Sequence, residues 1–485
     1  MNINKLLEIL SVNEKIKDFD VSDIVFDSRK CKENCVFVCI VGSAVDGHNY
    51  AEKAVEMGAK VVVAQKEIDI NAKLVVVPDT QKALALLSMQ FFGHPYKKLK
   101  TIGITGTKGK TTTAFMLKAI IEKTSAKVGV IGTIGKIIGD EVESLDNTTP
   151  ASYLVQKFMA EMVEKDCEYM VMEVSSIGLR DYRVYGFDFD CAVFTNFSHD
   201  HIGGVEHKDL DEYLDSKAML FSMCKNAAIN IDDEKADYII EKSNCNITKF
   251  GFSEKADIKG NNSHLISENG SLGSSVDVSG KENFTAEMSI PGKFNAYNAL
   301  SAITVAHILG IDEKAILSGL KEVKVRGRVE PVKVSDDFTF LLDYAHNAVS
   351  MENVLSTLRE YKPNRLISIF GAGGNRPKVR RFEMGESSGN LADLSIITED
   401  NSRFEEVLDI IEDIKTGINK TNGEYVVVPQ RKEAIRYAIK NAQKGDIIVL
   451  AGKGSEDYLD IKGVKYPFDE RDVIKEVMGE LGIEL

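Results

Sequence analysis

Residues 101–112 read TIGITGTKGKTT, and this stretch decides the fold of the middle of the chain. The apolar, β-branched run over 101–105 predicts a strand, followed by a glycine-rich turn and a helix over 112–123. Glycines let backbone N–H groups approach phosphate oxygens, and a helix N-terminus favours an anion. Lys110 is spaced to reach the outer phosphates and Thr111 to ligate Mg²⁺, although Ile104 stands where the strict pattern has its first glycine. The stretch therefore predicts a phosphate loop, with a glycine-rich turn carrying an incidental lysine as the alternative.

Strands and helices alternate on both sides of this loop. The first ~95 residues combine short β-branched runs with amphipathic stretches, and the breaker Gly93-His94-Pro95 marks a boundary. The polar stretch 258–287 predicts hairpins and loops, and a second boundary falls near 325–328. The remainder alternates again, as a doubly wound domain does. We expect an α/β protein with a small N-terminal α/β domain (1–96), a central domain with a mostly parallel, P-loop ATPase-like sheet (97–326) and a Rossmann-like C-terminal domain (327–485).

Composition excludes several classes of protein. The chain is 44% hydrophobic and 28% charged, which is globular. Its 60 Lys and Arg against 74 Asp and Glu give a net charge of −14, so general binding of nucleic acid or anionic membrane is not expected. No apolar run reaches the roughly 18 residues of a membrane span, and no signal peptide is visible, so we expect a cytoplasmic protein. Seven scattered cysteines without CxxC pairs argue against a disulfide framework or a zinc ribbon.

Three further positions carry possible chemistry. Glu173 lies near the carboxyl end of a strand predicted over 169–174, where open α/β sheets place ligands. A carboxylate there suits Mg²⁺, and a solvated strand-end acid is the alternative. His199-Asp200-His201 follows another strand and looks like a transition-metal pair, but no cysteine or third histidine has a matching spacing. Lys217, on a helix predicted over 213–221, reads by itself as a surface lysine.

More motifs follow in order along the chain. They are Asp27-Ser28-Arg29, Asn147-Thr148-Thr149-Pro150, Glu173-Val174-Ser175-Ser176-x-Gly178-Leu179, Asp200-His201, Lys217, Asn295-x-x-Asn298, Gly327-Arg328-x-Glu330, Asp343-Tyr344-Ala345-His346, Gly373-Gly374-x-Arg376 and Gly452-Lys453-Gly454. With the loop at 106–113, this set resembles the Mur ligases, the cytoplasmic ATP-dependent amino-acid ligases of peptidoglycan synthesis. It is most similar to the type that adds the third residue of the peptide.

The resemblance implies ATP and Mg²⁺ as cofactors. ATP is then expected on Gly106, Thr107, Lys108, Gly109, Lys110, Thr111, Thr112, Asn295, Arg328 and Asp343. The chemistry is expected on Lys110, Glu173, His201 and Lys217, and the metal on Thr111, Glu173, His201 and Lys217. In the family the matching lysine is carbamylated by CO₂, which turns a cation into an anionic oxygen ligand, so Lys217 is expected to act as a carbamate.

The resemblance also implies two substrate sites. The UDP-linked substrate is expected on Ser28, Asn147, Thr148, Thr149, Ser175 and Arg183, with the loop 41–47; simple turn chemistry is the alternative for Thr148-Thr149-Pro150. The amino acid is expected on Arg381, Asp400, Asn401, Arg403, Gly452 and Glu456. Asp400-Asn401-Ser402-Arg403 resembles the family's Asp-Asn-Pro-Arg motif, whose arginine pairs with the distal carboxylate of meso-2,6-diaminopimelate. Two arginines suit two carboxylates, and a plain surface charge is the alternative for Arg403.

We therefore expect an ATP-dependent ligase that adds meso-2,6-diaminopimelate to UDP-N-acetylmuramoyl-L-alanyl-D-glutamate through an acyl phosphate. It is expected to act as a monomer on this UDP-dipeptide and a diamino acid, without nucleic acid or a membrane span. Three alternatives stay open: the same ligase with L-lysine or another diamino acid, a folylpolyglutamate synthetase-like ligase, and a non-catalytic binding subunit of the same fold. Asn375, Phe382 and Ser402 depart from the family's pattern near the amino-acid site, and this leaves the identity of the amino acid open.

Overall fold

The structure is a computed structural model that describes residues 1–11, 16–42, 45–198, 206–268 and 270–483. The chain divides into two compact units. The first comprises Met1–Lys259 and Leu300–Ile316, and the second comprises Gly260–Ala299 and Leu317–Leu485. The boundaries expected at residues 96 and 326 stay predictions. In the described part of the chain, every helix is too short or too polar to cross a bilayer.

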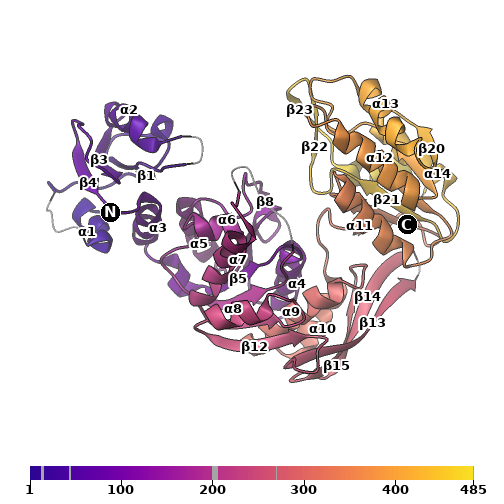
Figure 1. Ribbon diagram of the computed structural model, residues 1–485, viewed down its shortest axis with the longest axis horizontal. Coiled ribbons are helices and arrows are strands. Elements are labelled where there is room, and N and C mark those ends of the chain that lie inside the picture. The colour runs from indigo at the N-terminus through magenta and orange to yellow at the C-terminus, as the bar shows by residue number, and fades with distance from the viewer. Residues whose placement is uncertain (12–15, 43–44, 199–205, 269, 484–485) are drawn as a thin grey trace. The chain divides into compact units, whose positions relative to one another are not determined.

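The first unit begins with a four-stranded parallel sheet in the order β1-β2-β3-β4. Its strands are β1 (Ile24–Val25), β2 (Cys35–Val38), β3 (Ala59–Ala64) and β4 (Lys73–Val76). Alternate residues of β2 and β3 pack on opposite faces, toward α1 (Ile3–Leu7) and α3 (Thr80–Phe91) on one side and α2 (Ala51–Glu56) on the other (Figure 1). Apolar residues therefore fill both faces of these strands, which explains their short, unbroken β-branched runs. Cys35 and Cys39 are buried free thiols.

A larger sheet completes the first unit. Its parallel part runs β12-β11-β10-β5-β9-β6, and β7 and β8 extend it antiparallel from β6. The strands are β5 (Lys100–Thr105), β6 (Val128–Gly132), β7 (Gly135–Ile138), β8 (Glu141–Glu143), β9 (Tyr169–Glu173), β10 (Phe189–Phe194), β11 (Cys224–Asn230) and β12 (Asn246–Gly251). The helices are α4 (Lys110–Glu122), α5 (Ser152–Glu164), α6 (Ser176–Arg180), α7 (Leu210–Ala218) and α8 (Ala236–Lys242). Because β5 lies between β9 and β10, the carboxyl ends of these three strands meet at one edge.

The stretch predicted as hairpins and loops contains a hairpin, formed by β14 (Ser271–Gly280) and β15 (Phe284–Met288), but its strands are longer than a loop-rich segment would have. β13 (Ile258–Glu268) has 11 residues and β14 has 10, and β15 pairs antiparallel with β14. Many side chains of β13 are partly or fully exposed, and this is why its sequence is polar. The chain continues into α9 (Asn295–Leu309), as predicted, and α10 (Glu313–Glu322).

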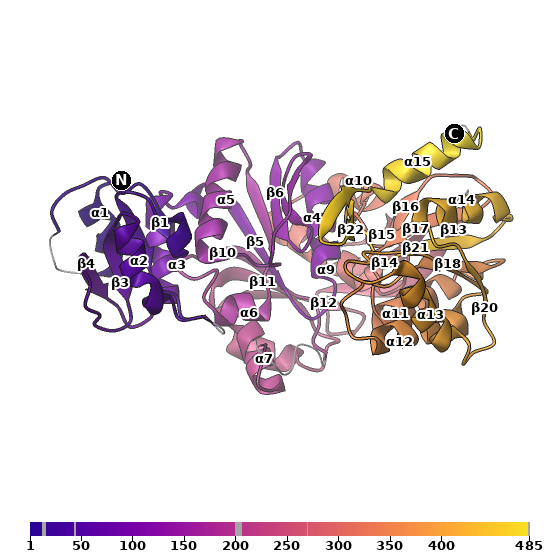
Figure 2. The ribbon, with the colours of Figure 1, turned by 90° about the horizontal axis from the view of Figure 1, so that it is seen from above.

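The rest of the second unit is a doubly wound layer structure. Its six-stranded sheet runs β16-β17-β21-β18-β19-β20, and all neighbours except β16 and β17 are parallel. The strands are β16 (Glu330–Val332), β17 (Thr339–Asp343), β18 (Leu366–Phe370), β19 (Leu394–Ile397), β20 (Glu424–Val427) and β21 (Ile447–Ala451), with a separate hairpin of β22 (Tyr458–Ile461) and β23 (Val464–Pro467). The helices are α11 (Ala348–Arg359), α12 (Val379–Leu391), α13 (Val407–Ile418), α14 (Arg431–Asn441) and α15 (Glu470–Glu480). Helices α11, α12 and α13 cover one face of this sheet, and α14 and α15 cover the other (Figure 2). An apolar core lies between the sheet and each group of helices. The predicted Rossmann-like arrangement is confirmed.

Candidate active site

The predicted phosphate loop joins β5 to α4, and its two glycines have positive φ angles of 148° at Gly106 and 85° at Gly109. A Cβ atom at Gly106 would lie 1.9 Å from Oγ1 of Thr195, so only glycine fits this close approach to β10. Helix α4 begins directly after Gly109, and its first N–H groups have no acceptor within the helix. The loop therefore has the form that binds a phosphate at a helix N-terminus.

Residues at the end of β10 hold the loop from behind. The Thr195 hydroxyl donates to the Lys108 carbonyl over 2.7 Å, and the Asn196 amide donates to the same oxygen over 3.0 Å. Lys108 N–H returns a bond of 2.9 Å to Oδ1 of Asn196. The sequence did not point to Thr195 and Asn196, because only the pairing of β10 with β5 brings them to a loop some ninety positions earlier.

Two lysines lie against the inner side of the loop. Nζ of Lys110 donates to the carbonyls of Gly106 and Thr107 over 2.8 and 3.0 Å. Nζ of Lys217 donates to the same Gly106 carbonyl over 2.9 Å. Lys217 is only 1% exposed and its Nζ lies 4.3 Å from the centre of the Tyr213 ring, so it is not the surface lysine that its helix position alone suggested.

Glu173 closes the site at the end of β9 and is 1% exposed. The Thr111 hydroxyl donates to Oε2 over 2.9 Å, and Thr133 donates to Oε1 through its N–H and to Oε2 through its hydroxyl over 2.9 and 3.1 Å. These donors hold the carboxylate beside the phosphate loop. A carboxylate and a threonine hydroxyl are the hard oxygen ligands that Mg²⁺ prefers, so Glu173 and Thr111 fit the implied ion.

The histidine part of the predicted metal set lies outside the described residues. This applies to His201 and to its neighbour His199. Within the described ranges, no three His, Cys, Asp or Glu side chains form a group that could hold a metal ion. The described donors are therefore Thr111 and Glu173, with the Lys217 amine held against the same loop.

A cavity of about 700 Å³ lies in the first unit, beside the predicted site for the UDP-linked substrate. It is lined by Phe26, Ile40, Val41, Gly42, Gln81, Leu84, Asn147, Ala151, Ser152, Ile177, Arg180, Asp181 and Arg183. Two predicted residues, Asn147 and Arg183, are thus brought to the loop that starts at Val41. Ser28 is buried at the start of a short 3₁₀ turn and does not line this cavity.

The neighbouring threonines connect this cavity to Glu173. The Thr149 hydroxyl is fully buried, donates to the Glu173 carbonyl over 2.9 Å and accepts from Ser175 N–H over 2.9 Å. Thr148 shares a hydrogen bond of 3.0 Å with Thr133. Arg183 donates to the Thr149 carbonyl over 2.8 Å and pairs with Asp181 over 3.0 Å. The Thr149 side chain thus fixes the turn after β9, and Arg183 keeps a partly exposed guanidinium at the cavity.

The other predicted ATP residues belong to the second unit. Asn295 is buried at the start of α9, where its amide donates to the Pro291 carbonyl over 2.8 Å. The Arg328 guanidinium lies 5.3 Å from the Tyr344 ring. Asp343 accepts from Val329 N–H and Ala345 N–H over 2.8 Å each, and burial raises the pKa of its carboxyl despite nearby Arg328.

A smaller cavity of about 140 Å³ occurs at the carboxyl ends of the strands in the second unit. It is lined by Tyr344, His346, Gly371, Ala372, Gly373, Arg376, Arg380, Asp400, Asn401, Arg403, Gly452 and Glu456. Five of the six residues predicted to bind the amino acid are therefore brought together. The Asn401 amide donates to Oε2 of Glu456 over 2.8 Å, and Arg403 donates to the Gly374 carbonyl over 2.8 Å.

Arg381 is the sixth predicted residue, and the structure corrects its position. Arg381 is 1% exposed, and its guanidinium pairs with Glu405 and Asp413 over 2.7 and 2.8 Å. Carboxylates of the protein itself, rather than of a substrate, therefore neutralise its charge. Arg376 and Arg380 line the cavity in its place. Arg376 lies before α12, and the sequence analysis named it only as part of a family motif, without a role at this site. Arg380 is the second residue of α12, and it could not be told apart from Arg381 without the rotation of the helix.

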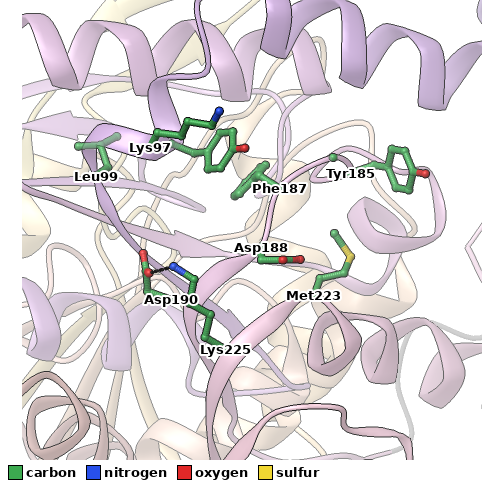
Figure 3. Close-up of a pocket in the computed structure, with 10 residues that line it drawn as sticks. Lys97, Leu99, Tyr185, Phe187, Asp188, Asp190, Met223 and Lys225 are labelled. Carbon is green, nitrogen blue, oxygen red and sulfur yellow. Dashed lines mark hydrogen bonds and ion pairs between the residues drawn. The ribbon is translucent and has the colours of Figure 1, made fainter. Parts of the chain in front are cut away.

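Another cavity of about 540 Å³ lies at the opposite edge of the central sheet (Figure 3). Its lining includes Leu99, Phe187 and Met223, which precede β5, β10 and β11. It is therefore at the amino ends of these strands, whereas the phosphate loop is at the carboxyl end of β5. None of the predicted site residues lines it.

Comparisons with known proteins agree along the whole chain. Residues 20–91 match the description "Mur ligase family, catalytic domain", residues 104–306 match "Mur ligase middle domain", and residues 327–454 match "Mur ligase, glutamate ligase domain". A protein of Caldanaerobacter subterraneus subsp. tengcongensis, named UDP-N-acetylmuramoyl-L-alanyl-D-glutamate–2,6-diaminopimelate ligase, is 42% identical over 98% of this chain and 99% of its own length. A Clostridium botulinum protein with the same name is 42% identical over 99% of this chain and 100% of its own.

Solved structures give the same result. A structure titled as that of a UDP-N-acetylmuramoyl-L-alanyl-D-glutamate–2,6-diaminopimelate ligase covers 99% of this chain and 100% of its own, with a TM-score of 0.75 and 28% identity. Folylpolyglutamate synthase of Mycobacterium tuberculosis, with a TM-score of 0.59 and 16% identity over 78% of this chain and 92% of its own, shares the fold alone. On the match to all three domain descriptions and the identity to relatives over nearly its full length, the chain belongs to the Mur ligase family.

Proposed function

We propose that this chain is the ATP-dependent ligase that joins 2,6-diaminopimelate to the D-glutamate of UDP-N-acetylmuramoyl-L-alanyl-D-glutamate in peptidoglycan synthesis. The observation that carries the proposal is the small cavity of the second unit, where three arginines face two carboxylates: Arg376, Arg380 and Arg403 with Asp400 and Glu456. Diaminopimelate has two carboxylates and two ammonium groups, so this set of charges complements it. The full-length relatives that carry this ligase name support the same assignment.

The reaction places several negative charges close together. The γ-phosphoryl group of ATP passes to the γ-carboxylate of D-glutamate and leaves ADP. The amine of diaminopimelate then attacks the acyl phosphate, and the tetrahedral intermediate expels phosphate and loses a proton to give the amide. We assign the ATP phosphates to the N–H groups of the phosphate loop and to Lys110. We assign Mg²⁺ to Glu173 and Thr111, together with His201; when bound, the ion neutralises charge on the transferring phosphoryl group.

Lys217 is assigned the carbamate role. Its amine lies against the Gly106 carbonyl beside the phosphate loop. A carbamate there would replace a positive charge next to Lys110 by an anionic oxygen ligand on a long arm. Its position next to the loop that also holds Lys110 supports this assignment.

The UDP-linked substrate is assigned to the 700 Å³ cavity, with Asn147 and Arg183 as polar contacts. Phe26 and Ile40, which follow β1 and β2, line this cavity, and the N-terminal sheet that carries them favours a Mur ligase over a folylpolyglutamate synthetase. Since ATP and a nucleotide-linked precursor are cytoplasmic metabolites, we infer that the chain acts in the cytoplasm. We also propose that it acts as a monomer.

A phosphate-release assay tests the proposal directly. The purified chain is mixed with ATP, Mg²⁺ and UDP-N-acetylmuramoyl-L-alanyl-D-glutamate, and then with meso-diaminopimelate, L-lysine or L-ornithine in separate reactions. We expect phosphate release that depends on both substrates and is fastest with diaminopimelate. A preference for lysine would move the assignment to a lysine-adding ligase, and no release with any amino acid would favour a non-catalytic role.

A further inference from the structure

Arg431 is the first residue of α14, and its side chain is 0% exposed. Its guanidinium donates to three different partners. Nη1 donates to the Glu399 carbonyl over 3.0 Å, Nη2 donates to the Ala451 carbonyl over 2.7 Å, and Nε donates to Oε1 of Glu470 over 2.6 Å. One planar side chain thus holds two carbonyls and one carboxylate in fixed directions.

The two carbonyls belong to the segments that carry the amino-acid cavity. Glu399 directly precedes Asp400, after the end of β19, and Ala451 ends β21 and directly precedes Gly452. Asp400 and Gly452 both line the cavity. β19 and β21 are not neighbours in the sheet, because β18 lies between them and pairs with both, so no ladder of backbone hydrogen bonds joins them directly.

The approach of these two segments is close. A Cβ atom at Gly452, where φ is 117°, would lie 2.4 Å from Oδ2 of Asp400. The Arg431 backbone N–H also donates to Oε1 of Glu399 over 3.0 Å, so the start of α14 is tied to the same turn. A small change in the spacing of the two strand ends would therefore move Asp400 against Gly452.

Glu470 provides the charge that allows Arg431 to be buried. It is the first residue of α15, and it too is 0% exposed. Buried ion pairs are seldom the most stable solution for a core, because the desolvation of both charges offsets their attraction. Arg431 also holds the two strand ends through the Glu399 and Ala451 carbonyls, which apolar side chains could not do.

We propose that Arg431 is a positioning residue of the amino-acid site, which sets the distance between Asp400 and Gly452 and so the affinity for the diamino acid. The inference rests on the proposed function. Arg431 does not line the cavity, and it acts through the two carbonyls that it holds.

The test is Arg431→Lys, measured by phosphate release with each substrate varied in turn. Lysine keeps the charge beside Glu470 but lacks the planar fork that reaches both carbonyls. We expect KM for diaminopimelate to rise about tenfold to a hundredfold, the range for a binding group displaced by about an ångström. KM for ATP and for the UDP-dipeptide should not change. A folded variant with the wild-type KM for diaminopimelate overturns the inference.

Arg365→Lys is the matched control. Arg365 precedes β18 and pairs with Asp446, which precedes β21, so it joins two strand ends at the opposite edge of the same sheet. Its Nη2 also donates to a backbone carbonyl, that of Asn441, over 2.8 Å. We expect this variant to lower the thermal midpoint without any selective rise in KM for diaminopimelate. A rise equal to that of Arg431→Lys would show that general loosening of the sheet is the cause, and would overturn the inference.

If Arg431→Lys does not fold, the double variant Arg431→Met and Glu470→Met tests the same effect on KM for diaminopimelate. Apolar replacement of a buried ion pair often preserves stability. We expect the same selective rise in KM for diaminopimelate. If neither variant folds, Arg431 serves the fold and the inference is overturned. If the wild-type protein itself does not use diaminopimelate, the proposed function fails instead, which separates the two outcomes.

Discussion

Lys110 and Lys217 donate hydrogen bonds to the same carbonyl oxygen, that of Gly106, over 2.8 and 2.9 Å. One lysine begins α4 and the other lies on α7, so two distant segments place their amines behind one turn of the phosphate loop. Two ammonium groups at one oxygen repel each other. Carbamylation of Lys217, the modification proposed above, would replace this repulsion by attraction. The shared carbonyl therefore brings the lysine of the phosphate loop and the lysine proposed to be carbamylated together at one turn.

Replacement of Lys217 by alanine tests the carbamate role. Without an oxygen donor on this arm, the charge on the transferring phosphoryl group is less well neutralised. We expect kcat to fall on the order of a hundredfold to a thousandfold, as when one stabilising group is removed from an active site. Added formate or acetate should restore part of the activity, since a small carboxylate can occupy the vacated space. Lys97→Ala, an exposed lysine at the opposite edge of the sheet, is the control. Full activity of Lys217→Ala without an added acid would refute the carbamate role.

Gly106→Ala tests the geometry of the phosphate loop. The new Cβ atom would meet Oγ1 of Thr195 at 1.9 Å, and φ at this position is 148°. Both the clash and the backbone strain act against the folded loop, so we expect a loss of more than about 2 kcal/mol in the free energy of unfolding. Binding of an ATP analogue should be lost as well. Urea unfolding and equilibrium titration measure the two effects.

Gly93→Ala is the control for the strain alone, because φ there is 73° but no atom lies within 4 Å of the added Cβ atom. We expect a cost of about 1 kcal/mol for the left-handed conformation and no change in nucleotide affinity. Equal effects of the two substitutions on stability would show that the clash with Thr195 is relieved by a shift of the loop.

Much of the fold could be predicted because it is encoded locally. The strand and helix around residues 101–123 follow from a β-branched run, two glycines and an amphipathic stretch, and they form as β5 and α4. The length of β13, in a stretch predicted as hairpins and loops, was not foreseen for a physical reason. Much of its surface is solvated, so its residues resemble those of a loop.

The site was less predictable where it depends on long-range packing. Thr133 donates twice to Glu173, forty positions away, yet nothing in the sequence near Thr133 indicates that role. Arg381 was assigned to the amino-acid site, but α12 turns it toward Glu405 and Asp413. Motifs could place the residues at the right strand ends, because ends of parallel strands share an edge. They could not give the rotation of a helix or the partner of a buried charge.

Asp46 gives a test that depends on pH. It accepts from His48 N–H over 2.9 Å and from Nδ1 of the His48 ring over 2.6 Å, and these bonds lower the pKa of its carboxyl to about 2. Because this value is below that of the unfolded chain, the ionised group stabilises the fold fully above about pH 4, and the contribution is lost as the pH falls through about 2. Asp46→Asn cannot titrate. We expect the difference in unfolding free energy between wild type and variant to be constant near neutral pH and to shrink in acid.

Urea unfolding of both proteins at several pH values measures this difference, with fluorescence from a label in the N-terminal sheet as the probe. The chain has no tryptophan, so the label is needed. The opposite sign, a gap that grows as the pH falls, would contradict the role of His48 as the partner of an ionised Asp46.

Arg403 tests the choice of amino acid. It lines the amino-acid cavity, donates to the Gly374 carbonyl over 2.8 Å, and its Nε lies 3.7 Å from Oδ2 of Asp460. These contacts aim the guanidinium without satisfying all of its five donors. Arg403→Ala removes a charged partner for a carboxylate, and a hydrogen bond to a charged group contributes about 1.5–3 kcal/mol. We expect KM for diaminopimelate to rise about tenfold to a hundredfold.

The rate with L-lysine separates this effect from damage to the fold, since lysine has no distal carboxylate for Arg403 to bind. The low activity with lysine should stay the same in Arg403→Ala, so the preference for diaminopimelate falls by the same factor as its affinity. Arg436→Ala is the control, because Arg436 pairs with Glu433 on α14 and does not line the cavity. If Arg403→Ala lowers activity with both amino acids equally, Arg403 supports the loop after β19 and does not read the second carboxylate, and Arg376 and Arg380 become the candidates for that contact.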